Sequence, residues 1–422
     1  MKFGIFYEHQ LPRPWSDGVE QKLFQDALNQ VELADKLGID YAWEVEHHFL
    51  EEYSHSSAPE IFLAAASQRT RNIRLGHGIR QVIAGYNHPA RTAECIATLD
   101  LVSNGRVDFG TGESSAILEL GGFGIPVATK REQYLEATEQ IANMLAMDPY
   151  PGFKGKYFEM PCRNIVPKPV QLPHPPLWVA CSNRETIKMA ARLGIGALTF
   201  AFVDPSEAKH WVDEYYNIIK SDECVPIGHA VNANICMVTS FSLHEDRQTA
   251  IERGLEGFEF FGYALGSLYG FGEHKPGRTN LFEEFRAMRE KKLADSPIDM
   301  SRALTAERGG IGTPDDMKVH LKKFEDVGVD QVTFIQQAGM NKHEHICESL
   351  ELFAEKVMPE FKARGKQREA KKQAELAPYI EAAMQRKTYM PRLADEDIPT
   401  FPALGRSIVE GEADPNKSAG NS

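Results

Sequence analysis

The sequence predicts an α/β protein built as a (β/α)8 TIM barrel with insertions and a C-terminal extension. Eight short apolar segments alternate with eight helical segments between residues 2 and 361. Such alternation favours a parallel sheet, and eight repeats favour a closed barrel over a doubly wound sheet. The predicted strands are 2–6, 41–45, 73–76, 107–110, 177–180, 197–200, 233–238 and 331–335.

Glycines mark the ends of several predicted helices. Gly38, Gly105, Gly194 and Gly328 each follow a helical segment and come a few residues before the next strand. Glycine is favoured just after a helix because it adopts the left-handed backbone conformation without strain. The predicted helices are 21–37, 59–68, 89–103, 131–146, 184–193, 205–220, 315–326 and 343–361.

Three stretches depart from this alternation. Residues 148–176 are rich in proline and predict an extended excursion or a small hairpin before the fifth strand. Residues 258–312 are long for one βα connection and contain many glycines, which predicts a lid, with a disordered loop as the alternative. We therefore expect a barrel domain at 1–361 and an extension at 362–422, which begins as a charged helix and ends as an irregular tail.

The composition is typical of a soluble, cytoplasmic protein. Hydrophobic residues make up 42% and charged residues 25%, and no apolar run has membrane-spanning length. A strand begins at Lys2, which leaves no room for the apolar segment of a signal peptide. The net charge of −13 argues against binding to nucleic acid, which requires a basic face. The six cysteines are scattered without a Cys-x-x-Cys pair, as expected for reduced thiols.

Two histidines follow the second predicted strand, in the sequence Glu46-His47-His48-Phe49. Functional side chains of barrel enzymes gather at the carboxyl ends of the strands. Adjacent strand residues point to opposite faces, so only one of the two histidines can enter a common site. The non-functional alternative is a histidine that only forms hydrogen bonds within its loop.

Other catalytic classes lack their usual signatures. Metal hydrolases of this fold usually have a His-x-His pair on one strand, because residues i and i+2 share a face. The histidines here are adjacent instead. The chain has no Gly-x-Ser-x-Gly elbow, no recognisable nucleophilic cysteine and no Walker-type phosphate loop. We therefore expect neither a metal site nor a covalent nucleophile.

A second candidate site follows the fifth strand, in Ala180-Cys181-Ser182-Asn183-Arg184. Ser182 or Asn183 can cap the next helix, and free N–H groups at a helix N-terminus bind anions. An ordinary helix cap would explain Ser182 alone. It does not explain Arg184, whose charge is unfavourable at a helix N-terminus unless an anion or a carboxylate compensates it. The segment therefore predicts a phosphate site.

Several segments together resemble the bacterial luciferase-like flavin-dependent monooxygenases. In chain order they are Lys2-Phe3-Gly4-Ile5-Phe6, Trp43 through Phe49, His88-Pro89-Ala90-Arg91, Leu99 through Gly112, Leu177-Trp178-Val179-Ala180 and Gly312-Thr313-Pro314-Asp315-Asp316. Each piece alone is weak, but their order and spacing make the resemblance specific, and it spans residues 1–361.

The resemblance implies a barrel that binds FMN at its C-terminal mouth. The first histidine of Glu-His-His-Phe, here His47, would lie near the isoalloxazine, stabilise a flavin hydroperoxide and act as an acid–base group. A cis peptide bond would lie beneath the flavin at Gly78-Ile79, and the insertion at 258–312 would correspond to a mobile loop that excludes water. The resemblance implies cofactor contacts from Gly78, Ile79, Ala180, Ser182, Asn183 and Arg184.

Two positions depart from the family pattern. Many relatives carry a phosphate-binding arginine where this chain has Glu113. A carboxylate there would repel phosphate, so we expect Glu113 to meet Arg184, Arg80 or the substrate. The luciferase cysteine near the flavin corresponds to Gly112, so light emission is not expected.

Aromatic residues near the strand ends are candidates for the wall of the substrate pocket. A place in the hydrophobic core is an equally good interpretation of aromatic residues at strand ends. The candidates are Phe6, Tyr7, Phe49 and Phe200.

The resemblance implies the oxygenase half of a two-component flavin system. A separate NAD(P)H-dependent flavin reductase would supply reduced FMN, and O2 would provide one oxygen atom for a small organic substrate. A deazaflavin-dependent hydride transferase and a non-catalytic flavin-binding protein are the alternatives. Glu46, His47 and the lid disfavour storage, which requires none of them. A homodimer is expected by resemblance only, and no residue selects the substrate.

Overall fold

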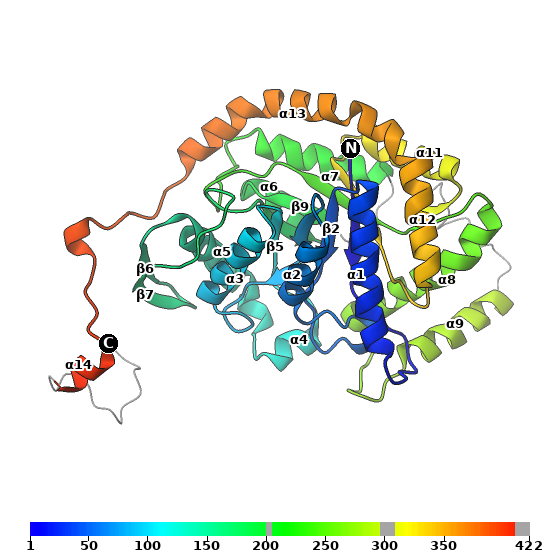
Figure 1. The fold of residues 1–422 in the computed structure, drawn as a ribbon, viewed down its shortest axis with the longest axis horizontal. Helices are drawn as coiled ribbons and strands as arrows, with labels where there is room; N and C mark the ends of the chain where they lie inside the picture. Colours follow the sequence, from blue (N-terminus) through cyan, green and yellow to red (C-terminus); the bar gives the residue numbers. More distant parts are fainter. Residues whose placement is uncertain (200–204, 296–308, 410–422) are drawn as a thin grey trace.

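The computed structural model describes residues 1–199, 205–295 and 309–409, and its centre is a closed barrel of eight parallel strands (Figure 1). Strand β1 pairs with both β2 and β13, and β3 pairs with β5 to close the ring. The predicted fold class is therefore confirmed. The barrel strands are β1 (Lys2–Tyr7), β2 (Tyr41–Glu44), β3 (Arg74–His77), β5 (Val107–Gly112), β8 (Leu177–Cys181), β9 (Gly196–Thr199), β10 (Ile235–Thr239) and β13 (Gln331–Ile335).

Helices alternate with these strands and surround the barrel. Every predicted strand and helix has a counterpart whose ends differ by a few residues, apart from the last predicted helix, which is two helices, α12 and the start of α13. The end of the predicted strand 197–200 falls at Phe200, outside the described residues. The surrounding helices are α1 (Val19–Leu37), α2 (Pro59–Arg69), α3 (Pro89–Val102), α5 (Lys130–Ala146), α6 (Arg184–Arg192), α7 (Pro205–Ile219), α11 (Pro314–Asp326) and α12 (His343–Lys356).

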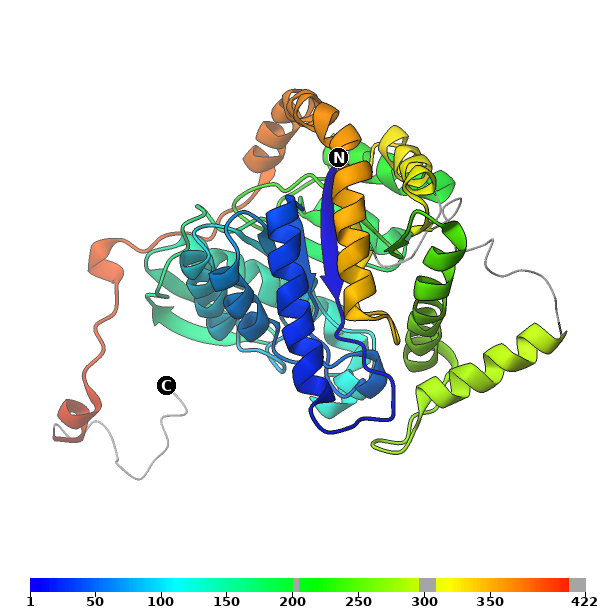
Figure 2. The same cartoon turned by 45° about the vertical axis from the view of Figure 1, so that its right-hand side comes forward.

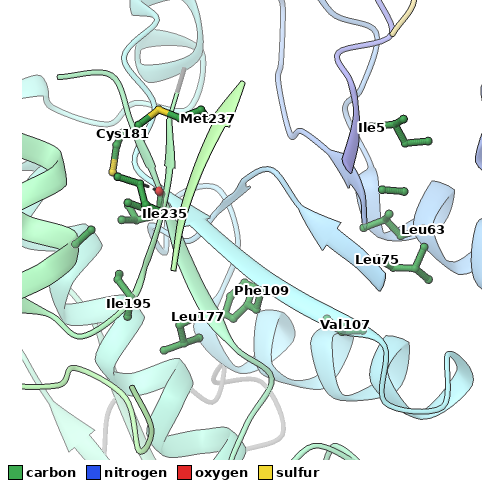
Figure 3. Packing of buried hydrophobic residues seen from close by; sticks show 14 of the residues in the cluster. Ile5, Leu63, Leu75, Val107, Phe109, Leu177, Cys181, Ile195, Ile235 and Met237 are labelled. Atoms are coloured by element: carbon green, nitrogen blue, oxygen red, sulfur yellow. Dashed lines mark hydrogen bonds between the residues drawn. The ribbon is translucent and has the colours of Figure 1, made fainter. Parts of the chain in front are cut away.

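Alternate strand residues belong to two separate hydrophobic clusters. Ala42 of β2 belongs to an outer cluster between strands and helices, whereas Tyr41 and Trp43 belong to an inner one. This is the period-two alternation of a strand with one face toward the helices and one toward the barrel axis. Figure 3 shows part of the outer cluster, with Ile5, Leu75, Val107, Phe109 and Leu63 among the labelled residues.

Two tryptophans fill the barrel interior. The rings of Trp43 and Trp178 meet edge to face with their centroids 5.3 Å apart, and the Trp178 Nε1–H donates to Asp108 over 2.8 Å. Glycines make room for both rings, because a Cβ on Gly76 would lie 2.2 Å from Trp43 and one on Gly196 would lie 2.4 Å from Trp178. Side chains fill the interior of the barrel, so we expect a ligand site at the mouth of the barrel.

The long insertion is largely helical rather than a loop. It contains the second half of α8 (Arg247–Gly266), the π-helical turn η3 (Ser267–Phe271) and α9 (Leu281–Asp295). Two of the glycines that suggested a loop, Gly262 and Gly266, lie within α8, and Gly266 gives room to the ring of Phe271. The rest of the predicted range 258–312 includes 296–308, which lies outside the described residues.

Two adjacent carboxylates hold the insertion against the barrel. Glu51 accepts a hydrogen bond from the backbone N–H of Gly277 over 2.7 Å. Glu52 accepts from the N–H groups of Leu281 and Phe282, at the start of α9, over 2.5 and 3.2 Å. These bonds satisfy helix N-terminal donors that would otherwise lack partners. The insertion is therefore attached to the loop that follows His47.

Outside the barrel, the proline-rich stretch contains the antiparallel hairpin β6 (Tyr150–Lys154) and β7 (Glu159–Arg163), as one of the two predicted forms. Helix α13 (Met358–Arg386) crosses the end of the barrel where β1 begins, and the chain then runs past the hairpin (Figures 1 and 2). The remaining elements are β4 (Arg80–Gln81), β11 (Ser242–Leu243), β12 (Ile311–Gly312), η1 (Glu51–Tyr53), α4 (Ile117–Gly122), η2 (Val127–Thr129), η4 (Asp395–Asp397) and α14 (Leu404–Val409).

The substitution Gly76→Ala tests the packing of the barrel interior. We expect it to lower the free energy of unfolding by about 1–3 kcal/mol, because the added methyl group overlaps the Trp43 ring. Gly262→Ala is the matched control, since a Cβ there meets nothing within 4 Å. Denaturant unfolding measures both variants, and equal stability of the two would contradict this packing.

Candidate active site

A cavity of about 540 Å³ opens at the carboxyl ends of the strands. The segments after β1, β2, β3, β5 and β8 contribute to it, and the insertion covers one side. Its lining residues are Glu8, Val45, His47, Tyr53, Gly78, Ile79, Gln81, Gly112, Glu113, Ser114, Ser115, Lys130, Arg131, Tyr134, Val179, Ala180, Ser182, Asn183, Thr186, Met189, Phe261, Leu265 and Tyr269.

His47 lies on the cavity wall between two carboxylates. Its Nδ1 is 2.9 Å from Oε1 of Glu119, and its Nε2 is 3.6 Å from Oε2 of Glu8. The hydroxyl of Tyr269, from the insertion, is 3.5 Å from the same Nδ1. The imidazole therefore has fixed neighbours on both nitrogens, one of them supplied by the insertion.

The carboxylates keep His47 protonated. Burial lowers the pKa of His47, but Glu119 and Glu8 together outweigh burial and raise this pKa to about 9. Burial raises the pKa of Glu119, and the charge and hydrogen bond of His47 lower it below its ordinary value. At neutral pH the pair is therefore an imidazolium and a carboxylate.

Glu8 is the titratable partner of this group. Burial raises the pKa of Glu8 to about 7, despite the opposing effects of His47 and of the hydrogen bond from Tyr53. The Tyr53 hydroxyl donates to its Oε1 over 3.0 Å, while its buried Oε2 has no hydrogen-bond partner among the described residues. Such an oxygen is able to accept a proton or a hydrogen bond from a bound molecule.

His48 points away from the cavity, as the alternation of strand residues predicted. Its Nε2 is 3.2 Å from Oε1 of Glu46, and its ring packs against Tyr86 and Phe123. Only one of the two adjacent histidines therefore enters the site.

The segment that the sequence predicts to bind phosphate lines the cavity at the start of α6, with one correction, and we call this part of the cavity the anion end. Ser182 and Asn183 line it at the start of α6, and the Asn183 side chain accepts from the Thr186 N–H over 3.0 Å. Arg184 does not line it, because its guanidinium is paired with Glu207 on α7 at 2.8 Å. A carboxylate thus compensates the charge of Arg184 at the helix N-terminus.

The cations at this end come from α5 instead. Lys130 and Arg131 line the cavity, and both are paired with Glu113. Two of the three expected partners of Glu113 are therefore wrong, because Arg184 is held by Glu207 and Arg80 is paired with Glu60 at 2.8 Å, while contact with the substrate stays a prediction.

The cavity surface between its two ends is formed by small residues at the strand ends. Gly78, Ile79 and Ala180 line it, as expected for these three positions. The expected cis peptide bond at Gly78–Ile79 is wrong, because every cis bond among the described residues precedes a proline. The trans segment is held by the Gly78 N–H, which donates to Glu44, and by the Ile79 carbonyl, which accepts from Glu46.

The aromatic candidates among the described residues, Phe6, Tyr7 and Phe49, do not line the cavity. Phe6 lies in the inner cluster beneath Gly78, and Tyr7 lies in the outer cluster, where its hydroxyl donates to Gln30 over 3.1 Å. Phe49 is 53% exposed and packs on Phe123. Phe200 lies outside the described residues. For Phe6 and Tyr7 the core interpretation is the correct one.

Sequence reasoning missed the aromatic wall and one of the carboxylates. The wall is formed by Tyr53, from the loop after β2, and by Phe261 and Tyr269 of the insertion. Glu119 belongs to the short helix α4, whose sequence has no motif that points toward His47. Its only sequence signal is a position shortly after a barrel strand.

Within residues 1–199, 205–295 and 309–409, no group of three or more His, Cys, Asp or Glu side chains has an arrangement that could hold a metal ion. None of the helices in these ranges is long and apolar enough to cross a membrane.

The arrangement matches a known family. The family model of the luciferase-like monooxygenases covers residues 1–331. The chain belongs to the luciferase-like monooxygenase family. This confirms the resemblance that the sequence motifs indicated.

Individual luciferase-like relatives use different cofactors, according to their names. The oxygenase component of the flavin-dependent trigonelline monooxygenase of Acinetobacter baylyi is 24% identical and covers 86% of this chain and 96% of its own. The F420-dependent glucose-6-phosphate dehydrogenase of Amycolatopsis mediterranei is 26% identical, with coverages of 81% and 96%. An uncharacterised Sinorhizobium fredii protein is 34% identical, but the match spans only 40% of this chain and 49% of that protein.

Solved structures show the same fold. A monooxygenase from Streptomyces bottropensis superposes with a TM-score of 0.69 at 26% identity, covering 86% of this chain and all of that one. The relatives therefore establish family and fold, and they leave the cofactor open between a flavin and a deazaflavin.

The substitution Glu119→Gln tests the charge of His47. We expect the pKa of His47 to fall from about 9 toward its ordinary value near 6.5, because the variant removes the closer carboxylate. NMR titration of the imidazole nitrogens measures this change. Glu132→Gln is the control, since Glu132 is exposed and pairs with Lys156. Protonated His47 at pH 8 in Glu119→Gln would contradict the assignment.

The same pKa predicts how stability depends on pH. The folded-state pKa of His47 lies above its unfolded value near 6.5, so protonation favours the folded protein. This contribution is complete below about pH 6.5 and is lost as the pH rises toward 9. We expect the stability difference between wild type and His47→Asn to shrink over this range in denaturant unfolding. A constant difference would contradict the prediction.

Proposed function

We propose that the chain is the oxygenase component of a two-component flavin-dependent monooxygenase. It would use reduced FMN from a separate NAD(P)H-dependent flavin reductase, together with O2, to oxygenate a small organic substrate. The observation that carries this proposal is the position of His47 between Glu119 and Glu8, on the wall of a cavity that Lys130 and Arg131 also line. A homodimer and a cytoplasmic location remain predictions.

The residues of the cavity fit FMN. Its volume of about 540 Å³ lies in the range of cofactor pockets. The phosphate would be held by Lys130, Arg131 and the backbone N–H groups at the start of α6. Small residues at the strand ends allow a planar ring to approach the backbone, and Oε2 of Glu8, which has no hydrogen-bond partner among the described residues, offers a buried acceptor beside His47.

When bound, reduced FMN would supply the activation of O2, and the side chains of the chain would control charge and protons. The imidazolium of His47 presents a proton and a positive charge to negative charge that develops beside it. Glu119 keeps that proton on His47, and Glu8 is able to take up a proton near neutral pH. Phe261, Leu265 and Tyr269 of the insertion cover the cavity and exclude water.

The name of the Acinetobacter baylyi relative supports a monooxygenase, and its alignment covers most of both chains. A deazaflavin-dependent hydride transferase is the second candidate. It is favoured by Glu113, because this carboxylate leaves Lys130 and Arg131 with a net charge of only +1. That charge suits a singly charged phosphodiester better than the doubly charged phosphate of FMN. A storage protein would not require a buried ionised group such as His47, whose burial is costly.

Anaerobic titration distinguishes the two cofactors. We expect reduced FMN to bind with a change in flavin absorbance, and a reduced deazaflavin to bind at least about tenfold more weakly. Tighter binding of the deazaflavin would favour hydride transfer and overturn the oxygenase proposal.

His47→Ala tests the role of the imidazole. We expect this variant to retain FMN binding and to lose oxygenated product, because it removes the proton donor and leaves the anion end intact. His48→Ala is the matched control, since His48 lies beside His47 in the chain and outside the cavity. Full turnover by His47→Ala, measured as product per O2 consumed, would remove His47 from the mechanism.

A further inference from the structure

Three charged side chains form a compact cluster at the anion end of the cavity. Glu113 accepts hydrogen bonds from Lys130 Nζ over 2.9 Å and from Arg131 Nε and Nη2 over 2.8 and 2.7 Å. All three residues line the cavity, so the cluster faces the space in which a ligand would bind. We call Glu113, Lys130 and Arg131 the charge cluster.

The cluster already contains an anion of its own. Burial raises the pKa of Glu113, but hydrogen bonds from Arg131 and Lys130 lower this pKa below its ordinary value, so the carboxylate is ionised at neutral pH. The side chain of Glu113 is 15% exposed, and those of Lys130 and Arg131 are 18% and 43% exposed.

Among the described residues, no other lysine or arginine side chain lines the cavity and could substitute for Lys130 and Arg131. Arg184, the cation that the sequence placed at this site, is held by Glu207 and does not line the cavity. Lys130 and Arg131 are the lysine and arginine among the residues that do line it. A phosphate at this end would compete with Glu113 for charge-assisted hydrogen bonds from Lys130 and Arg131.

We propose that Glu113 is a displaceable counter-ion that competes with the phosphate of the cofactor for Lys130 and Arg131. This inference rests on the proposed function. The incoming phosphate releases the carboxylate from both cations, and repulsion between the two anions weakens cofactor binding. This weakening applies only to a flavin that carries a phosphate. Glu113 therefore lowers the affinity for FMN without changing how the flavin ring binds.

A weak phosphate site suits a protein that binds and releases its flavin in every catalytic cycle. Reduced FMN from a separate reductase has to enter the cavity, and oxidised FMN has to leave it for the next cycle. Affinity differences between variants of one site appear mainly in the rate of release. Glu113 therefore favours exchange of the flavin over its retention.

The test compares FMN with riboflavin, which has the same ring and lacks the phosphate. Flavin fluorescence titrations give the Kd of each for the wild-type protein and for Glu113→Gln. We expect FMN to bind Glu113→Gln at least about tenfold more tightly than wild type, which corresponds to about 1.4 kcal/mol. Riboflavin should bind both proteins equally, which also shows that the variant is folded. Glu113→Ala should change the FMN affinity in the same direction.

Glu132→Gln is the matched control. Glu132 lies on α5 next to Arg131, but its side chain is 58% exposed and pairs with Lys156 rather than lining the cavity. Removal of its charge should leave the affinities for FMN and for riboflavin unchanged. This result would show that the effect of Glu113 comes from its contact with Lys130 and Arg131 and not from the overall charge of the protein.

The outcomes separate this inference from the proposed function. Equal or weaker FMN binding by Glu113→Gln, with riboflavin binding retained, would overturn the counter-ion role and leave the flavin site standing. An equal gain for riboflavin would also overturn it, since Glu113 would then act on the ring. Failure of the wild-type protein to bind either flavin would overturn the proposed function itself.

Discussion

The ion pair between His47 and Glu119, supported by Glu8, is the interaction on which the site depends. It joins three segments that are distant in sequence: the ends of β1 and β2 and the short helix α4. Glu119 also accepts a hydrogen bond from the backbone N–H of His48 over 2.8 Å, so it fixes the loop as well as the imidazole. A charged group this well enclosed requires partners, because an unpaired ion would be costly to bury.

The barrel determines where this pair is able to meet a ligand. Trp43 and Trp178 fill the interior, so the remaining space lies above them at the carboxyl ends of the strands. Glu52 fixes the start of α9, and η3 brings Tyr269 over His47. The insertion thus covers the part of the cavity beside His47, while the start of α6 and the charge cluster line another part of it. One cavity therefore brings together an imidazole and two cations.

Sequence reasoning predicted the elements well and the long-range pairs poorly. Strand and helix positions follow from local patterns and glycine stops, and His47 follows from its place after β2. The partners of Arg184 and Glu113 depend on α7 and α5, whose rotation around the barrel is set by packing rather than by a motif. Phe6 and Tyr7 were misplaced for a similar reason. Their position at the end of a strand does not determine whether their side chains reach the cavity above Trp43 and Trp178.

Stopped-flow absorbance of reduced FMN, mixed with the protein and then with O2, tests whether His47 controls the reaction of the flavin with oxygen. We expect two resolved phases of flavin oxidation, of which the first depends on O2 concentration and the second does not. We expect His47→Ala to show a single phase of flavin oxidation, because this variant lacks the imidazolium charge that makes the two phases distinct. Oxidation of FMN in a single phase, at the rate seen without protein, would contradict an oxygenase that acts through His47.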